Sequence, residues 1–180
     1  TGILGAARVV SMNTTPRQNS SEIETLIADA ARVMPALAGL LDAVAAETSS
    51  VALMGPLKSK ASIARKVAAD YAGDASRVVD ICRGSLVCES NPYALIEAIA
   101  RRVRIVRLKD RFAAPVMGYR DACLTVEIDG HLCEVQVHIR QIIEVKEILH
   151  LAYEYHRVTP CPVAAAWMEI AFDHAYAGLL

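Results

Sequence analysis

Hydrophobic and polar positions alternate almost without interruption over residues 119–140. Successive side chains of a strand point to opposite faces, so this pattern predicts two half-buried β-strands. Asp129 and Gly130 separate the two alternating runs, and this dipeptide is a strong signal for a tight hairpin turn. One face of the second strand is apolar. The other face carries a row of polar side chains, namely Glu134, Gln136 and His138.

Elsewhere in the chain, apolar residues recur every three or four positions, which predicts helices. These helices extend over 19–48, 58–73, 91–103, 141–158 and 163–178. Two β-branched runs, 76–88 and 104–111, predict further strands. The order of helices, strand, helix, strand, hairpin and helices predicts an α/β (α+β) domain with a mixed sheet and helices on its faces.

Composition adds little to this picture and excludes several classes of protein. A net charge of −1 gives no overall basic surface for nucleic acid or membrane. No apolar run approaches the roughly 18 residues that span a bilayer. The five cysteines have no zinc-binding spacing, so we expect reduced and mostly buried thiols.

Three polar residues of the second predicted helix, Lys58, Ser62 and Lys66, recur at i, i+4 and i+8. On a helix they fall near one stripe. Two ammonium groups with a hydroxyl between them suit a polyphosphate, and a solvated basic face gives the same pattern.

Two acidic residues interrupt predicted strands: Asp80 lies among valines, and Glu134 shares a strand face with Gln136. A carboxylate inside a sheet is costly unless it is paired or binds a cation. Asp80 is therefore either a salt-bridge partner of Arg83 or another Arg, or a ligand of Mg²⁺. Two carboxylates on neighbouring strands, with phosphates completing the shell, are a ligand set that Mg²⁺ accepts. Tyr119, where the hairpin begins, is either a core residue or a surface for base stacking.

Taken in order, these features resemble the synthetase domain of the RelA/SpoT family, which makes alarmone nucleotides. The segment GPLKSKASIARK, residues 55–66, follows the family pattern Gly-Arg-x-Lys-x-x-x-Ser-Ile-x-x-Lys except at the Arg. A strand with an Asp follows in VVDICRG, and then come LKDR (108–111), PVMGY (115–119) and GHLCEVQVHIR (130–140). The matches extend from about 55 to 140.

The resemblance implies a nucleotidyltransferase-like mixed sheet of about five strands flanked by helices. It implies an enzyme that transfers pyrophosphate from ATP to the 3′-hydroxyl of a purine nucleotide with Mg²⁺ as cofactor and AMP as leaving group. The ATP site would comprise Lys58, Ser62, Arg65, Lys66 and Arg83. The catalytic and metal-binding residues would be Asp80 and Glu134. The acceptor would contact Tyr119, Gln136, Lys109 and Arg111.

Several residues depart from the family pattern around both substrates. Pro56 stands where the family has Arg, and Ser85 replaces an Arg late in the strand that follows. In the Gly-Tyr-x-Ser-Leu-His motif, Asp121 and Cys123 replace the Ser and the His. These changes resemble divergent single-domain synthetases found as toxins, some of which modify adenine nucleotides. We therefore expect an adenine acceptor, giving (p)ppApp, ahead of a guanine acceptor, giving (p)ppGpp.

The chain lacks the hydrolase and regulatory domains of the long family members and does not begin with Met. We expect the toxin domain of a larger antibacterial effector, delivered into the bacterial cytoplasm, where it depletes ATP, and neutralised by an immunity protein. Residues 1–18 would be an arm or linker and 19–180 the synthetase domain. Within it, N-terminal helices would cover 19–50, a catalytic core 55–157 and a C-terminal helix 163–178.

Other hypotheses stay open on the sequence. A housekeeping small alarmone synthetase making (p)ppGpp, a catalytically inactive relative, and a toxin that pyrophosphorylates tRNA 3′ ends all fit parts of the pattern. The basic run 101–107 would serve tRNA in the last case. We expect His138 at the rim of the cleft, and His150 and His156 to be structural.

Overall fold

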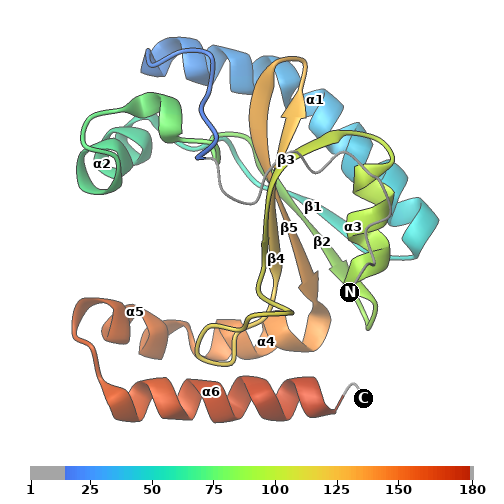
Figure 1. Ribbon diagram of the computed structural model, residues 1–180, viewed down its shortest axis with the longest axis vertical. Coiled ribbons are helices and arrows are strands. Elements are labelled where there is room, and N and C mark those ends of the chain that lie inside the picture. The colour runs from blue at the N-terminus through green and yellow to red at the C-terminus, as the bar shows by residue number, and fades with distance from the viewer. Residues whose placement is uncertain (1–14, 179–180) are drawn as a thin grey trace.

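Five strands form one mixed sheet in the order β1-β2-β5-β4-β3, in the computed structural model that describes residues 15–178 (Figure 1). Only the β2–β5 pair is parallel among these strands. The strands are β1 (Val51–Met54), β2 (Arg83–Cys88), β3 (Arg104–Asp110), β4 (Ala122–Ile128) and β5 (His131–Ile139). The prediction of an α/β fold with about five strands flanked by helices is confirmed.

Six α-helices and one short 3₁₀-helix complete the described part of the chain. They are α1 (Ile23–Thr48), α2 (Lys60–Asp70), η1 (Ala75–Arg77), α3 (Pro92–Ala100), α4 (Arg140–Ile148), α5 (His150–Val158) and α6 (Pro162–Ala177). No helix within residues 15–178 has the length and apolar character that crossing a membrane requires.

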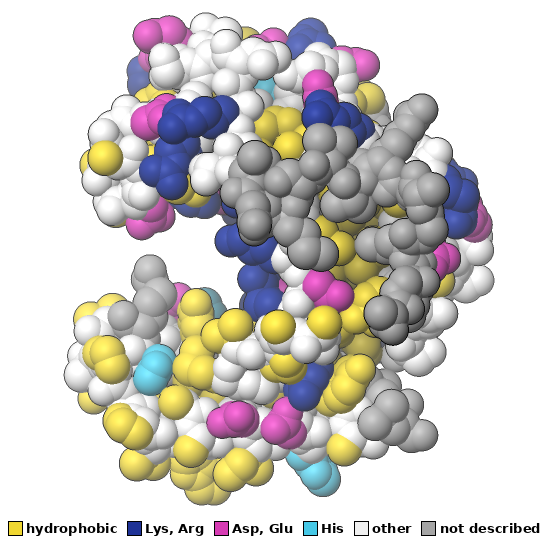
Figure 2. All heavy atoms as spheres, in the orientation of Figure 1, with side chains coloured by type: hydrophobic (Ala, Val, Ile, Leu, Met, Phe, Trp, Pro, Cys, Tyr) yellow, Lys and Arg dark blue, Asp and Glu magenta, His cyan; other side chains and the backbone are white. Residues whose placement is uncertain are grey.

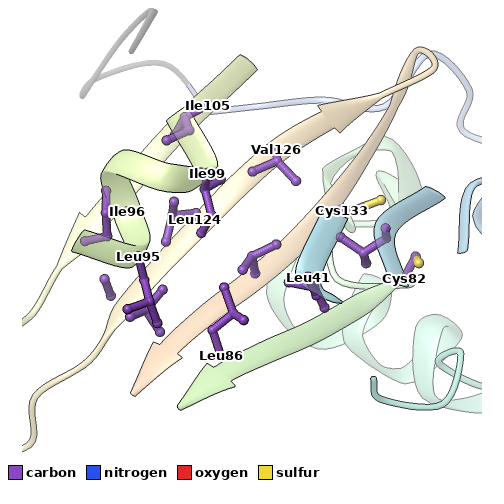
Figure 3. Packing of buried hydrophobic residues seen from close by; sticks show 14 of the residues in the cluster. Leu41, Cys82, Leu86, Leu95, Ile96, Ile99, Ile105, Leu124, Val126 and Cys133 are labelled. Atoms are coloured by element: carbon purple, nitrogen blue, oxygen red, sulfur yellow. The ribbon is translucent and has the colours of Figure 1, made fainter. Parts of the chain in front are cut away.

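Helices α1 and α3 cover one face of the sheet and bury the main core (Figure 1). Leu41 of α1 and Leu95 and Ile99 of α3 meet the strand side chains there (Figure 3). Gly84 of β2 allows this close approach, because a Cβ at that position would lie 2.3 Å from Cδ1 of Leu41. The opposite face of the central strands is left to α2 and to the C-terminal helices.

The hairpin between β4 and β5 has the predicted turn. Asp129 and Gly130 both have positive φ, 46° and 78°, as a two-residue turn of this type requires. The resulting register pairs Glu134 with Thr125 on β4, and β2 places Arg83 on the other side of Glu134. The alternation seen in the sequence therefore brings the polar row of β5 onto the face that α1 and α3 leave open.

The predicted helix over 141–158 is divided into α4 and α5. Leu149 interrupts it with φ −87° and ψ 2°. The strand β1 was not predicted, since its four residues carry no clear alternation.

Two boundaries near the predicted phosphate site also differ from prediction. Ser59 caps α2 by accepting a hydrogen bond from the backbone N–H of Ser62, so the helix begins at Lys60 and Lys58 lies in the preceding loop. The strand predicted over 76–88 begins at Arg83. Asp80 therefore lies in the irregular segment that leads into β2, rather than inside a strand.

The arm predicted over residues 1–18 lies mostly outside the described residues. At its end, Gln18 is buried, and its side-chain amide donates to the carbonyls of Val78 and Leu132 and accepts from the N–H of Leu132. The chain is thus fixed to the sheet before α1 begins.

Candidate functional site

A hollow separates α2 from the C-terminal helices, and Lys and Arg side chains line its depth (Figure 2). It opens over the sheet face that α1 and α3 leave uncovered (Figure 1). Two cavities border this region, one against α2 and one against α4, α5 and α6.

The first, which we call the cationic cavity, has a volume of about 690 Å³. Four of the nine residues that line it are Lys or Arg. Its lining comprises Leu57, Lys58, Ser59, Ser62, Arg65, Lys66, Ala69, Asp70 and Arg83. The structure thus gathers all five residues predicted to bind ATP around one cavity.

Asp80 anchors both lysines of this cavity. Its Oδ2 lies 3.0 Å from Nζ of Lys58 and 2.8 Å from Nζ of Lys66. Burial raises the pKa of Asp80, but the hydrogen bonds and charges of Lys66 and Lys58 outweigh it and hold the pKa below its usual value. The second oxygen, Oδ1, is buried and has no hydrogen-bond partner among the described residues.

Arg65 and Arg83 have no ion-pair partner within residues 15–178, so their charges are available to a ligand. The backbone N–H of Gly55 donates to the carbonyl of Arg83 at 3.1 Å. A Cβ on Gly55 would lie 3.2 Å from Cγ of Arg83, so Gly55 gives the Arg83 side chain room beside the cavity. Pro56 follows at the position where the family pattern has Arg.

Glu134 stands on β5 beside Arg83, which lines the cationic cavity. Its Oε1 accepts a hydrogen bond from Nε2 of Gln136 at 2.7 Å, and its Oε2 accepts from Sγ of Cys123 at 3.3 Å. Burial, followed by the neighbouring Glu134, raises the pKa of Cys123 to about 12, so this cysteine stays a thiol and donates. Both carboxylate oxygens are therefore held by the protein.

The second, which we call the aromatic cavity, has a volume of about 400 Å³. It is lined by Arg111, Val116, Met117, Tyr119, Asp121, Gln136, Lys146, Leu149, His150, Tyr153, Met168 and Phe172. Gln136 lines the aromatic cavity and donates a hydrogen bond to Glu134. Arg83 lines the cationic cavity and is the register partner of Glu134 in the sheet.

Asp121 organises one wall of the aromatic cavity. It is only 2% exposed, and Nε and Nη2 of Arg111 donate to its two oxygens at 2.5 and 2.8 Å. The hydroxyl of Tyr119 donates to Oδ2 of the same carboxylate at 3.0 Å. Burial and the Asp121 charge raise the pKa of Tyr119, which therefore remains a protonated phenol.

The Tyr119 ring is fixed from several sides. It meets Phe172 of α6 edge-on, with 5.4 Å between ring centroids, and Nζ of Lys146 lies 5.2 Å from its centroid. The preceding Gly118 has φ 74°, and a Cβ there would lie 2.7 Å from the carbonyl oxygen of Glu169. The Gly-Tyr loop therefore packs directly on α6.

Three polar residues of this cavity that were not predicted to bind a ligand are Lys146, His150 and Tyr153. They come from α4 and α5, and their i, i+4, i+7 spacing was a signal that could have found them. His150, which we expected to be structural, lies in the cavity wall. Lys109 is exposed on β3 and lines neither cavity.

The prediction for His138 is wrong in its placement. This residue is 1% exposed and so lies in the interior, not at the rim of a cleft. The reason is that α4, which begins directly after β5, packs against that end of the strand.

The acidic residues fit a magnesium ion that is shared with a phosphate ligand. Within the described residues no three His, Cys, Asp or Glu side chains cluster as a complete metal cage. Mg²⁺, however, is commonly held by one or two carboxylates together with substrate phosphates. The buried Oδ1 of Asp80, without a hydrogen-bond partner, is the kind of atom that such an ion would satisfy.

No family model matches the sequence, and no curated protein matches it. Solved structures do match. The type VI effector Tas1, solved in complex with its immunity protein, is 19% identical with a TM-score of 0.72, over 87% of this chain and 97% of Tas1. Small alarmone synthetase 1 from Bacillus subtilis is 16% identical with a TM-score of 0.69, over 89% and 93% of the two chains.

A GTP pyrophosphokinase family protein from Streptococcus pneumoniae is 20% identical with a TM-score of 0.64, over 87% of both chains. At such identities the likeness establishes the fold. The chain has the fold of the small alarmone synthetases, and the predicted resemblance to a RelA/SpoT-like synthetase domain is confirmed at that level.

Proposed function

We propose that this chain is a Mg²⁺-dependent pyrophosphokinase that transfers pyrophosphate from ATP to the 3′-hydroxyl of a purine nucleotide. One observation carries the proposal: Glu134 adjoins a cationic cavity through Arg83 and an aromatic cavity through Gln136. Phosphoryl transfer depends mainly on positioning and on charge neutralisation, which two adjoining sites of this chemistry supply. The fold shared with small alarmone synthetases supports the same assignment.

The triphosphate of ATP would occupy the cationic cavity. Lys58 and Lys66 line this cavity, and their ammonium groups contact Asp80. Arg65 and Arg83 have no carboxylate partner among the described residues, so no ion pair has to break before they bind a phosphate. The hydroxyl of Ser62, near the start of α2, adds a hydrogen-bond donor to the phosphates.

Asp80 and Glu134 would hold Mg²⁺ between them. When bound, the ion neutralises charge on the phosphates. The acceptor 3′-oxygen bonds to the β-phosphorus of ATP, the bond from that phosphorus to the oxygen of the departing AMP breaks, and the hydroxyl proton passes to a carboxylate oxygen of Glu134. Gln136 and Cys123 keep that carboxylate in place.

The acceptor nucleotide would enter the aromatic cavity, with its base against Tyr119 and its phosphates near Lys146 and Arg111. We infer an adenine base. Guanine presents an N1–H and an amino group that call for acceptors, and the one carboxylate in this lining, Asp121, already accepts from Arg111 and Tyr119.

The setting we propose is that of a toxin domain from an antibacterial effector, which acts in the bacterial cytoplasm by depleting ATP. Support comes from the fold likeness to the effector Tas1, which was solved with its immunity protein. A similar neutralising partner is proposed for this chain. A housekeeping synthetase making (p)ppGpp is the alternative, and the likeness to small alarmone synthetase 1 from Bacillus subtilis supports it.

The tRNA hypothesis has less support. Arg101 and Arg102 both pair with Glu47, and Arg104 pairs with Glu127. Two acids of the chain, Glu47 and Glu127, thus offset two of the four positive charges of the basic run 101–107.

The test incubates purified protein with ATP, Mg²⁺ and one of ADP, GDP or deacylated tRNA, and separates the nucleotides by anion exchange. We expect AMP release with ADP above that with GDP. The Glu134→Gln variant should lose at least about 100-fold of this activity, because charge-stabilising interactions contribute several kcal/mol to such a step. Absence of AMP with every acceptor would refute the pyrophosphokinase, and a higher rate with GDP would refute the adenine preference.

A further inference from the structure

Three polar side chains on one face of β5 form a continuous row of hydrogen bonds. Gln136 Nε2 donates to Glu134 Oε1 at 2.7 Å, and Gln136 Oε1 lies 3.2 Å from Nε2 of His138. His138 is 1% exposed and lines neither cavity. The row therefore runs from the interior to the carboxylate of the candidate site.

The chemistry of these groups fixes the direction of every hydrogen bond in the row. An ionised carboxylate only accepts, so the NH₂ group of Gln136 must face Glu134. The amide oxygen then faces His138, and this oxygen also only accepts. Nε2 of His138 must consequently carry the proton that is donated.

The other ring nitrogen agrees with this assignment. Nδ1 of His138 is buried and has no partner among the described residues. In the Nε2–H tautomer it is a bare acceptor, whereas a second proton would leave a buried N–H unsatisfied, which is the costlier state. Burial lowers the pKa of His138 to about 4; the charges of Lys146 and Arg111 act in the same direction, and the charge of Asp121 acts in the opposite one. The ring is therefore neutral at pH 7.

We propose that His138 is a positioning residue: as the neutral Nε2–H tautomer it fixes the orientation of the Gln136 amide, which in turn holds Glu134 Oε1 in place. Without this donor, the Gln136 amide could rotate and turn its oxygen toward the carboxylate. The catalytic consequence rests on the proposed function, whereas the tautomer and the row do not.

Two substitutions separate positioning from packing. His138→Gln can present an amide N–H near the place of Nε2, and His138→Leu fills the same interior space without a donor. His131→Gln is the matched control, since His131 is also buried on β5 but contacts Gln18 at the far end of the strand.

The first readout is the ¹⁵N NMR spectrum of the wild-type histidines, assigned through His138→Gln. We expect the Nε2–H tautomer at neutral pH. The second readout is kinetic. His138→Leu should lose at least about tenfold in kcat, with the KM for ATP changed by less than about twofold, while His138→Gln and His131→Gln stay within about threefold of wild type.

An Nδ1–H tautomer or a charged ring at neutral pH would overturn the proposal, whatever the activity. So would a His138→Leu enzyme with wild-type kcat, or equal losses in His138→Leu and His131→Gln. If the wild type releases no AMP with any acceptor, the proposed function is refuted. The ¹⁵N NMR readout of the His138 tautomer then tests the inference by itself.

Discussion

At the residue scale, the role of a side chain in this site depends more on the groups that contact it than on its residue type. Cys123 shows this clearly, because its thiol replaces the His of the family pattern and donates to Oε2 of Glu134. Its neighbours keep it protonated. In the sequence, Cys123 suggests that a functional His has been lost. In the structure, it donates a hydrogen bond that helps to hold the carboxylate of Glu134.

The thiol donor of Cys123 can be tested by substitution. Cys123→Ser keeps a donor and should retain most of the activity, whereas Cys123→Ala should lower kcat about three- to tenfold, as expected for one hydrogen bond worth about 1 kcal/mol. Steady-state AMP release measures both. Equal losses in the two variants would show that the volume of the side chain matters and the donor does not.

Reactivity of the cysteines follows from the same environment. At pH 8 a thiol with a pKa of about 12 is almost wholly protonated, so Cys123 should resist iodoacetamide in the folded protein. Cys161, the one cysteine that is not buried, should be alkylated first. Peptide mass spectrometry over time measures the order, and early labelling of Cys123 would contradict the structure.

His138 predicts a pH dependence of stability with a definite sign. Its pKa is lowered from 6.5 to about 4 on folding, so the unfolded state binds the proton first. Stability is therefore lost as the pH falls from about 6.5 to 4, by up to about 3 kcal/mol, and the loss is constant below that range. Urea titrations of wild type and His138→Gln should diverge in this window, while His174→Gln, on the exposed surface of α6, should follow wild type.

At the element scale, the loop before β4 contains a glycine at which any side chain would be strained. Gly118 combines a positive φ with a Cβ position 2.7 Å from the Glu169 carbonyl. We expect Gly118→Ala to destabilise the fold by about 2 kcal/mol or more and to raise the KM for the acceptor, because Tyr119 must move away from α6.

The control for this substitution is Gly39→Ala in α1. Nothing lies within 4 Å of a Cβ at Gly39, so alanine should stabilise the helix by up to about 1 kcal/mol. Thermal and urea denaturation measure both variants. A Gly118→Ala protein as stable as wild type would show that the loop and α6 are not in the contact described.

Local signals in the sequence predicted those elements whose ends are set locally. Asn91 and Pro92 mark the start of α3, and Asp129 with Gly130 mark the hairpin; all four lie as predicted. Boundaries that depend on tertiary contacts were missed. The break at Leu149 follows no Gly or Pro, and the short β1 exists because β2 lies beside it.

The candidate site divides in the same way. Residue types and their order predicted that Lys58, Lys66, Asp80 and Glu134 belong to one site, and the structure places them near one another. Lys58 was nevertheless assigned to a helix and Asp80 to a strand, and both lie in the segments before these elements. What the sequence could not indicate is that Asp121 would already accept three hydrogen bonds from Arg111 and Tyr119. This depends on the register of β4 against the segment after β3, where the backbone N–H of Arg111 donates to the carbonyl of Asp121.

At the scale of the whole molecule, charge is separated although its sum is close to zero. The net charge of −1 gives no attraction for ATP, whereas the cationic cavity gathers four Lys and Arg side chains at one side of the hollow. Attraction of a polyanion must therefore come from the local field of this cavity, which salt screens over about 10 Å at 0.1 M.

Two positive charges of α2 distinguish a local field from the net charge. Arg65 lines the cationic cavity, while Lys60, on the same helix, is exposed and pairs with Glu24. Removing either one changes the net charge equally. We expect Arg65→Ala to raise the KM for ATP about tenfold at low salt, and Lys60→Ala to change it less than about twofold. The difference should shrink as KCl rises from about 50 to 300 mM, since screening weakens the local field. Equal effects of the two substitutions would mean that ATP responds to the charge of the whole molecule, and the cationic cavity would lose its role as the donor site.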